Sequence, residues 1–223
     1  MIKENTLING NCQEYWEQIK RDLNVALILT DPPYNINFKY DSYEDQIPDD
    51  KYIHLFGTFK DEIMAICHYP EEMMKYVVPA LGIPIEVLAW CYNSNIGKQF
   101  RLFNIYGKKP DFSKVKQPYK NPTDKRVKKL IDNGSEGTSL YDWFSDIQIV
   151  KNVSKKDNSH PCPVPVSLME RLILLLTDEG DLVYDPFMGS GTTALACQKT
   201  NRKFIGTEID EKYYEESLNR VFT

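Results

Sequence analysis

The chain has 223 residues, of which 42% are hydrophobic and 26% charged, and its net charge at pH 7 is −5. This length suits one domain, or one domain with a small insertion. The sequence contains no run of 18 apolar residues, so we expect no membrane span. Residues 1–11 lack the apolar segment of a secretion signal, so we do not expect export.

The five cysteines and three histidines are scattered along the chain and form no metal-binding motif. Zinc sites need ligands grouped at short spacings, so we expect no metal. Isolated cysteines without a secretion signal are typical of reduced thiols inside the cell. We therefore expect a cytoplasmic protein.

The basic residues are unevenly distributed. Between Lys98 and Lys129, eleven lysines and arginines face only Asp111 and Asp124, so this segment carries +9 and the remainder −14. A basic face on an acidic body suits phosphate binding, whereas a strongly acidic surface would repel nucleic acid. A solvated lysine-rich loop would have the same composition, and charge alone does not separate these two interpretations.

The N-terminal part predicts alternating strands and helices. Residues 25–29 form a continuous apolar run, typical of a strand buried on both faces. Pro32 and Pro33 end this strand, because proline cannot continue a central strand. The expected elements are a strand at 6–8, a helix at 12–23, a strand at 25–29, a mobile polar loop at 41–50, a helix at 69–80 and a buried strand at 85–90.

Residues 96–157 are basic, rich in turns and weakly periodic, which predicts a strand pair followed by an inserted recognition segment. Regular elements return as a helix at 166–177, a strand at 182–184, a helix at 189–199, a strand at 203–207 and a helix at 211–221. Strands that alternate with helices predict a mostly parallel α/β sheet. We therefore expect residues 1–95 and 158–223 to form one domain around the insertion 96–157.

A glycine-rich loop, Asp185 to Thr193, follows one of these strands and opens a helix. Gly189 and Gly191 permit a tight turn close to a ligand, and the free N–H groups of the helix suit a carboxylate. Asp185 could hold an ammonium group, and Glu208 ends the next strand, where an acid can bind ribose hydroxyls. These features favour a nucleoside that carries an amino acid. A dinucleotide site or a purely structural turn would also explain Gly-Ser-Gly.

The most specific motif is Asp31-Pro32-Pro33-Tyr34-Asn35, directly after a buried strand. The two prolines stiffen the loop and remove two N–H donors, so the loop presents carbonyl acceptors. Asp31 adds a carboxylate and Tyr34 a flat ring. Rigid acceptors beside an aromatic face suit a planar base with an amino group, whereas the alternative is a proline turn that only closes the strand.

Three motifs together resemble the amino-group DNA methyltransferases: Asp31 to Tyr34, the loop Asp185 to Thr193, and Gly206-x-Glu208 followed by Tyr213. The order of these motifs, with the cofactor loop last, is similar to the permuted beta subgroup. The resemblance implies a Rossmann-like α/β fold, S-adenosylmethionine as cofactor and double-stranded DNA as partner. It also implies that the strand ending at Gly10-Asn11 lies beside the strand ending at Glu208.

The resemblance assigns catalysis to Asp31, Pro32, Pro33 and Tyr34. The residues that it implies for cofactor binding are Asn11, Cys12, Asp31, His160, Asp185, Phe187, Gly189, Ser190, Gly191, Thr192, Thr193 and Glu208. Asn11 departs from the family, which commonly has aspartate there. The expected reaction methylates adenine N6 after the base has rotated out of the duplex. Asp31 and the Pro32 carbonyl would bind the amino group while Tyr34 stacks on the base.

Several alternatives stay open. Cytosine N4 is the first, although Asp rather than Ser before Pro-Pro-Tyr favours adenine in this family. A catalytically silent DNA-binding partner is the second, and an RNA or protein substrate is less favoured. Segment 98–129 would bind phosphates, with Tyr119, Tyr141, Trp143 and Phe144 as candidates for base contact or for the core of the insertion. The short chain also suggests a homodimer, a short target site or relaxed specificity.

Overall fold

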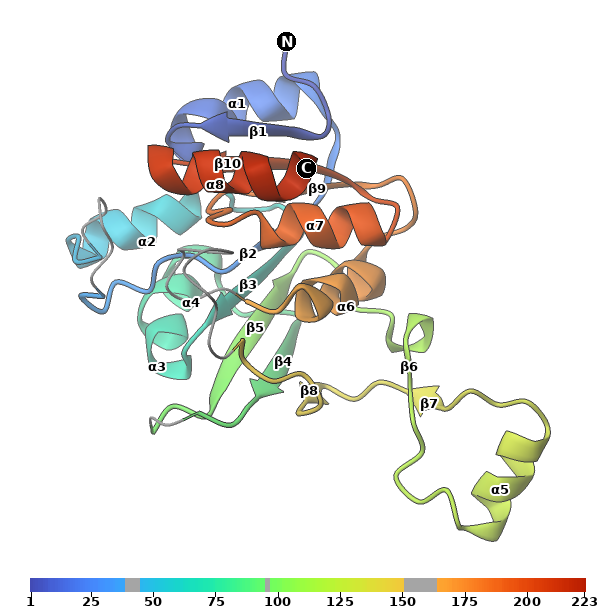
Figure 1. Cartoon of the computed structure of the whole chain (residues 1–223). Coiled ribbons are helices and arrows are strands. Elements are labelled where there is room, and N and C mark those ends of the chain that lie inside the picture. Colours follow the sequence, from blue (N-terminus) through green and yellow to red (C-terminus); the bar gives the residue numbers. More distant parts are fainter. Residues whose placement is uncertain (39–44, 95–96, 151–163) are drawn as a thin grey trace.

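The computed structural model describes residues 1–38, 45–94, 97–150 and 164–223, which build an α/β structure around one central sheet (Figure 1). In spatial order its strands are β1 (Thr6–Asn9), β10 (Lys203–Glu208), β9 (Leu182–Asp185), β2 (Val25–Thr30), β3 (Met64–His68), β5 (Phe100–Tyr106), β4 (Glu86–Cys91) and β8 (Trp143–Phe144). The strands from β1 to β3 are parallel to one another, and β5 is antiparallel to both of its neighbours. The expected mostly parallel sheet is confirmed.

Helices cover both faces of the sheet (Figure 1). One face carries α6 (Val166–Leu176), α7 (Thr192–Lys199) and α8 (Glu211–Phe222), and the other carries α1 (Cys12–Asp22), α2 (Asp49–Gly57) and the run of α3 (Pro70–Glu72), the π-helical η1 (Met73–Val77) and α4 (Val78–Leu81). None of the helices in the described ranges has the length and apolar composition needed to cross a bilayer.

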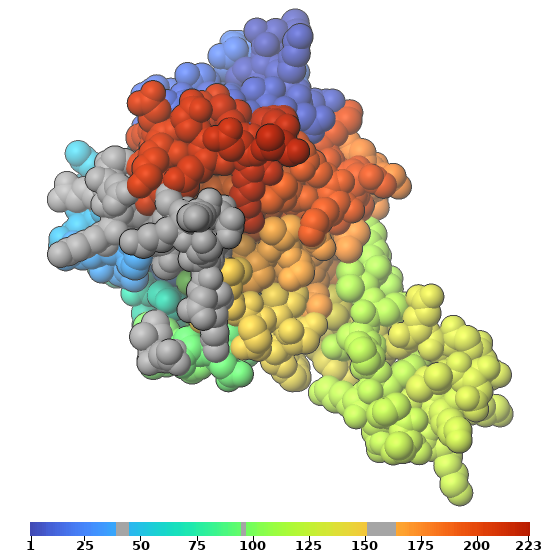
Figure 2. Space-filling model, in the orientation of Figure 1, coloured from blue at the N-terminus to red at the C-terminus, as the bar shows by residue number. Residues whose placement is uncertain are grey.

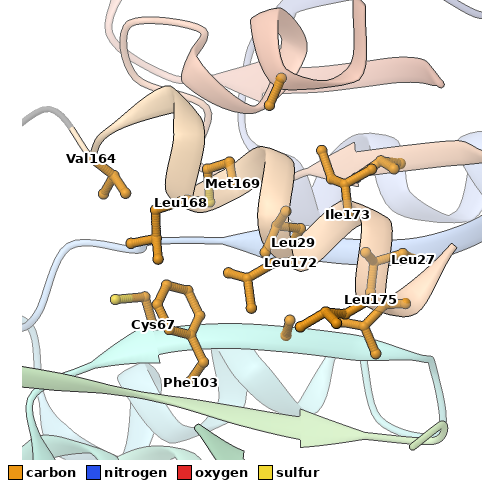
Figure 3. Packing of buried hydrophobic residues seen from close by; sticks show 14 of the residues in the cluster. Leu27, Leu29, Cys67, Phe103, Val164, Leu168, Met169, Leu172, Ile173 and Leu175 are labelled. Carbon is orange, nitrogen blue, oxygen red and sulfur yellow. The ribbon is translucent and has the colours of Figure 1, made fainter. Parts of the chain in front are cut away.

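Alternation along the strands divides the core into two hydrophobic clusters, one on each face. In β2, Leu27 and Leu29 belong to the cluster under α6, whereas Ile28 belongs to the cluster under α1, because successive strand residues point to opposite faces. Helix α6 lies across β2, β3 and β5 and points Leu168 and Leu172 into the first cluster (Figure 3). Burial on both faces explains the apolar sequence of β2.

The strand order changes direction between β9 and β2. After β9 the chain continues to β10, whereas after β2 it continues to β3 on the opposite side. An open α/β sheet leaves a crevice at the carboxyl ends of its strands at such a point. At the same end of the sheet Asn9 pairs with Glu208, which confirms that the two ends of the chain lie side by side.

Part of the range 96–157 projects from the body as a lobe (Figures 1 and 2). Strands β5 and β8 fall in this range but belong to the central sheet. Between them lie the 3-10 turn η2 (Phe112–Lys114), the small sheet of β6 (Lys116–Gln117) and β7 (Thr138–Ser139), and α5 (Lys125–Asp132). The projecting lobe carries β6, α5 and β7, whereas Phe112, Val115 and Leu140 pack against the first cluster. The lobe is therefore narrower than the predicted insertion.

Two local expectations were wrong. The strand expected to be buried at 85–90 is β4, in which Val87 is 38% exposed, because β4 lies beside a two-residue edge strand and is covered on one face. The polar loop expected at 41–50 ends earlier, because Asp49 and Asp50 begin α2. Aspartates are favourable in the first turn of a helix, where they meet the positive end of its dipole. Residues 41–44 lie outside the described ranges.

We predict that Leu172→Ala lowers the free energy of unfolding by about 2–5 kcal/mol, because it leaves a cavity between α6 and the sheet. Leu130→Ala is the matched control, since Leu130 lies on α5 and is 48% exposed, and it should change the free energy by less than about 0.5 kcal/mol. Urea unfolding followed by circular dichroism measures both values. Similar losses in the two variants would contradict the assignment of the core.

Candidate functional site

A cleft of about 250 Å³ opens at the carboxyl ends of β1, β2, β9 and β10. Its walls come from the loops that follow these strands, and they include Gly10, Asn11, Cys12, Gln13, Asp31, Pro32, Pro33, Tyr34, Arg101, Pro186, Phe187, Gly189, Glu208, Ile209, Asp210 and Tyr213. A smaller hollow of about 40 Å³ shares Asp31, Phe187 and Gly189 with the cleft and extends to Asp185 and Thr193. The Asp31 to Tyr34 loop and the glycine-rich loop Asp185 to Thr193 therefore meet in one place.

Two side chains tie the ends of β2 and β9 together. The Thr30 hydroxyl donates to Asp185 Oδ1 at 2.7 Å, and both side chains are buried. Asp31 follows Thr30 directly, so this bond fixes the first residue of the Asp31 to Tyr34 loop beside the glycine-rich loop.

Tyr34 is turned into the protein. Its hydroxyl donates to Asp31 Oδ1 and lies 3.4 Å from Cys67 Sγ. Its ring stacks on His68 at 4.2 Å between centroids, and the Arg101 guanidinium lies 5.3 Å from the ring centroid. The Tyr34 ring was expected to stack on a base, but in this conformation it contacts His68 and Arg101.

Tyr52 and His68 pack against the Asp31 to Tyr34 loop on its buried side. The Tyr52 hydroxyl donates to the Pro33 carbonyl and lies 3.0 Å from His68 Nε2. Burial and the charge of Arg101 lower the pKa of His68 to about 3, so the ring is neutral at pH 7. His68 could not be identified from the sequence, because an isolated histidine at a strand end carries no spacing signal.

Asp31 is partly buried, with 16% of its side chain exposed. Burial raises the pKa of its carboxyl, whereas the Arg101 charge and the Tyr34 hydroxyl lower it. Arg101 Nη1 lies 3.2 Å from Asp31 Oδ2. Arg101 was expected among the phosphate-binding residues of segment 98–129, and that expectation was wrong, because its side chain is only 13% exposed and points into the cleft wall.

The glycine-rich loop is organised around Asp185. This carboxylate accepts hydrogen bonds from the Thr30 hydroxyl, the Phe187 N–H and, at 2.5 Å, the Thr193 hydroxyl. Burial raises the pKa of Asp185 to about 6, against the effect of these three donors. Asp185 is therefore ionised at pH 7 and lines the smaller hollow, where a cation would find a carboxylate.

Glu208 closes the other end of the cleft. Its two carboxylate oxygens accept from the N–H groups of Gly189 and Asp210, each at 2.9 Å, and burial raises its pKa. Asn11 Oδ1 accepts from the Gln13 N–H and so caps α1. Cys12 is buried in the same wall, and burial raises the pKa of its thiol to about 12.

Arg220 of α8 holds the glycine-rich loop from outside. Its Nη1 donates to the Ser190 carbonyl and hydroxyl at 2.9 Å each and to the Thr192 hydroxyl at 3.2 Å. Ser190 and Thr192, which were expected to bind the cofactor, also line the smaller hollow. Arg220 could not be identified from the sequence, because only the fold brings α8 against this loop.

The structure brings together every predicted site residue that it describes except Gly191. That glycine lines neither the cleft nor the smaller hollow. It has φ +77, and a Cβ there would lie 2.8 Å from Val221 Cγ2, so its described role is close packing under α8. His160 lies outside the described ranges.

Comparisons with known proteins identify a family. A family model described as DNA methylase (N6_N4_Mtase) matches residues 54–219. Type II methyltransferase M.HpaI of Haemophilus parainfluenzae is 27% identical over 89% of this chain and 68% of its own length. DNA adenine methyltransferase YhdJ of Escherichia coli K12 is 29% identical over 97% of this chain and 82% of its own length. The chain spans 54% of a third relative, Type II methyltransferase M.BamHI of Bacillus amyloliquefaciens.

Solved structures show the same fold. The M1.HpyAVI–SAM complex matches with a TM-score of 0.67 at 20% identity, over 98% of this chain and 99% of that chain. The PvuII DNA methyltransferase, described as cytosine-N4-specific, matches with a TM-score of 0.68 at 17% identity, over 99% of this chain and 87% of that chain. The fold is therefore that of S-adenosylmethionine-dependent DNA methyltransferases.

We predict that Gly191→Ala destabilises the protein more than Gly180→Ala does. Both glycines have positive φ, but a Cβ at Gly180 meets nothing within 4 Å, whereas at Gly191 it meets Val221. Gly180→Ala should therefore lower the free energy of unfolding by about 1–2 kcal/mol, the cost of the left-handed backbone. Gly191→Ala should add about 1–3 kcal/mol for overpacking. Urea unfolding compares them, and equal losses would contradict the close packing of the loop under α8.

Proposed function

The chain belongs to the DNA methylase family, and we propose that it transfers a methyl group from S-adenosylmethionine to the N6 amino group of adenine in double-stranded DNA. The observation that carries this proposal is the shared cleft in which the Asp31 to Tyr34 loop faces the glycine-rich loop. The Thr30–Asp185 hydrogen bond holds the two loops next to each other. This arrangement supports an acceptor for an amino group beside a site for a nucleoside that carries an amino acid.

The residues of the cleft fit S-adenosylmethionine by their chemistry. Asp185 offers a carboxylate to the ammonium group, and Glu208 offers acceptors to the ribose hydroxyls. Phe187, Ile209 and Tyr213 supply an apolar wall for the adenine ring. When bound, this cofactor supplies an electrophilic methyl group on a sulfonium centre.

The chain's contribution to the reaction is to position and polarise the target amino group. Asp31 and the Pro32 carbonyl accept hydrogen bonds from that group, which localises the nitrogen lone pair toward the methyl group. Tyr34 stacks on the base after the base has left the duplex. The amino nitrogen loses one proton after it has gained the methyl group, and Asp31 takes this proton and passes it to water.

Access for the base requires a change at Asp31. Its Oδ1 atom is occupied by the Tyr34 hydroxyl, and Arg101 holds its Oδ2 atom. When Tyr34 turns to stack on the base, its hydroxyl leaves Oδ1, and the amino group takes that position. One donor replaces another, so the carboxylate is not left without a partner.

Asp31 supports adenine over cytosine as the target, because in this family Asp-Pro-Pro-Tyr is more typical of adenine enzymes. The similarity to YhdJ, named as a DNA adenine methyltransferase, points the same way. The PvuII enzyme keeps cytosine N4 as the second candidate, since it shares the fold over most of this chain.

The projecting lobe is the part of the chain that we propose to hold the DNA backbone. Its helix α5 exposes Lys125, Arg126, Lys128 and Lys129. Lys120 lies over Tyr141 and Trp143, at 4.5 and 5.2 Å from the ring centroids, and both rings are exposed. Phe144, by contrast, is buried in the core. A homodimer that completes a DNA clamp stays a prediction.

Other lysines of segment 98–129 have partners inside the protein. Lys108 Nζ donates to the Leu176 carbonyl at 2.9 Å, and Lys114 Nζ donates to the Thr177 carbonyl at 3.0 Å. These two ammonium groups neutralise the carboxyl end of α6. We therefore leave these two lysines out of the proposed phosphate-binding set.

We predict that Asp31→Ala abolishes methyl transfer and leaves cofactor binding within a few-fold of wild type. The variant loses the carboxylate that binds the amino group, whereas Asp185 and Glu208 remain. Transfer of radiolabelled methyl to unmethylated DNA measures activity, and calorimetry measures cofactor affinity. Nucleoside chromatography of the wild-type product should place the label in N6-methyladenine.

Label in N4-methylcytosine would move the assignment to the second candidate. Full activity in Asp31→Ala would overturn the role of this motif. Cofactor binding without label on any DNA would favour an RNA or protein substrate, or a silent partner subunit.

We predict that DNA binding weakens when glutamine replaces Lys125, Arg126, Lys128 and Lys129. The slope of log affinity against log salt, which is negative, should become shallower by about 3–4, roughly one per lost phosphate contact. Lys108→Gln with Lys114→Gln is the control pair, because these lysines donate to the carbonyls of Leu176 and Thr177 at the end of α6. The control pair should lower stability without changing the slope. Fluorescence anisotropy at several salt concentrations measures both, and an unchanged slope in the α5 variant would remove α5 from the interface.

A further inference from the structure

Arg101 is the charged residue of the basic segment whose place in the fold differs most from its expected role. It lies in β5, between β3 and β4, and points its guanidinium at Asp31. Its side chain is only 13% exposed, so it cannot meet a DNA phosphate at the surface. Among the described residues, Asp31 is the one carboxylate with which it forms an ion pair.

Four aromatic rings surround this guanidinium. The centroids of Tyr34, Tyr69, Trp90 and Tyr92 lie 5.3, 5.4, 5.5 and 5.9 Å from its central carbon. Cations are attracted to such ring faces, and more strongly where water is excluded. Trp90 is itself fixed, because its Nε1 donates to the Ile147 carbonyl at 2.7 Å.

The cage leaves the guanidinium little freedom. Arg101 Nε is buried and has no hydrogen-bond partner within the described part of the chain. The ring faces and Asp31 Oδ2 therefore hold the group. Arg202, at the opposite end of the sheet, is held differently, because its guanidinium donates to the carbonyls of Thr177 and Thr200.

Arg101 is also the cation that faces Asp31 from the surrounding elements. The other titratable groups around Asp31 are Tyr34 on its own loop, Cys67 on β3 and Asp185 on β9. The pKa values of Tyr34 and Cys67 are raised by burial, so both are neutral at pH 7. Asp185 carries a like charge, and His68, behind Tyr34, is neutral.

We propose that Arg101 is a positioning residue for methyl transfer, whose caged guanidinium holds Asp31 Oδ2 and keeps the carboxylate an ionised acceptor while Oδ1 receives the target amino group. This inference rests on the proposed function. The Tyr34 hydroxyl and the amino group exchange at Oδ1, whereas Arg101 keeps Oδ2 throughout. The buried carboxyl would otherwise take up a proton, and a protonated carboxyl accepts the amino N–H only weakly.

The sign of the pH effect follows from the charges. Burial raises the pKa of Asp31 and Arg101 lowers it, so removal of the guanidinium must raise this pKa further. Activity that needs the carboxylate is then lost at a higher pH as the solution is acidified. At alkaline pH the carboxyl ionises even without Arg101, and the rate recovers.

The experiment is the pH profile of the single-turnover rate of methyl transfer to DNA for wild type, Arg101→Gln and Arg101→Lys. In Arg101→Gln the acidic limb should move up by about 1–3 pH units, the range for loss of an adjacent opposite charge. In Arg101→Lys the limb should stay near that of wild type, because the positive charge remains. The KM for DNA should be unchanged in both variants, because Arg101 does not contact phosphate.

Arg202→Gln is the matched control. It removes a partly buried arginine far from the cleft, so it should lower the unfolding midpoint and leave the pH profile in place. If Arg101→Gln lowers the rate by the same factor at every pH, Arg101 is only structural and the proposal is overturned. If Arg101→Gln does not fold, the test rests on Arg101→Lys. A shift of its acidic limb by about one pH unit or more would then overturn the proposal.

The failure of this proposal is distinguishable from failure of the proposed function. Methylation by wild type together with unshifted profiles in the variants would remove the role of Arg101 alone. Absence of methylation by wild type on any DNA would remove the proposed function and this inference with it.

Discussion

The site depends on one buried hydrogen bond, from the Thr30 hydroxyl to Asp185 at 2.7 Å. It joins the carboxyl ends of the neighbouring strands β2 and β9. After these two strands the chain continues to opposite sides of the sheet. Parallel pairing brings the two ends to one edge of the sheet, but the loops that follow could still diverge. Together with the Thr193 hydroxyl and the Phe187 N–H, the Thr30 hydroxyl also stabilises the buried Asp185 carboxylate by hydrogen bonds. The same donors therefore support both the carboxylate and the spacing between the loops.

Most of the parallel sheet could be predicted from the sequence, because strands buried on both faces have a simple signature. Apolar runs such as 25–29, each ended by proline, glycine or an acid, identify β2, β9 and β10 without knowledge of their neighbours. The two motifs could also be placed, since each follows such a strand. Their meeting in one cleft follows from topology, because the carboxyl ends of adjacent parallel strands share an edge.

Other parts could not be predicted, since their signals depend on tertiary partners. Helix α2 is short and begins in aspartates, which resemble a loop until the helix dipole is considered. Arg101 belongs to a run of basic residues, and nothing local distinguishes an arginine that will be caged by aromatic rings from one that will be solvated. Arg220 meets Ser190 only because α8 folds back over the loop. Such contacts join residues far apart in sequence.

The region around Asp31 shows how a buried carboxylate can remain available for chemistry. An unpaired buried charge is costly, so removing one partner of a buried ion pair is strongly destabilising. Here the two oxygens have separate partners of different kinds: a neutral hydroxyl on a side chain at the cleft and a caged cation behind it. The hydroxyl can be exchanged for another neutral donor with little change in free energy, because one hydrogen bond replaces another. The cation could not be exchanged in this way, since the cleft offers no second positive charge among the described residues that line it. The arrangement therefore separates the part of the carboxylate that must change partners from the part that must keep its charge.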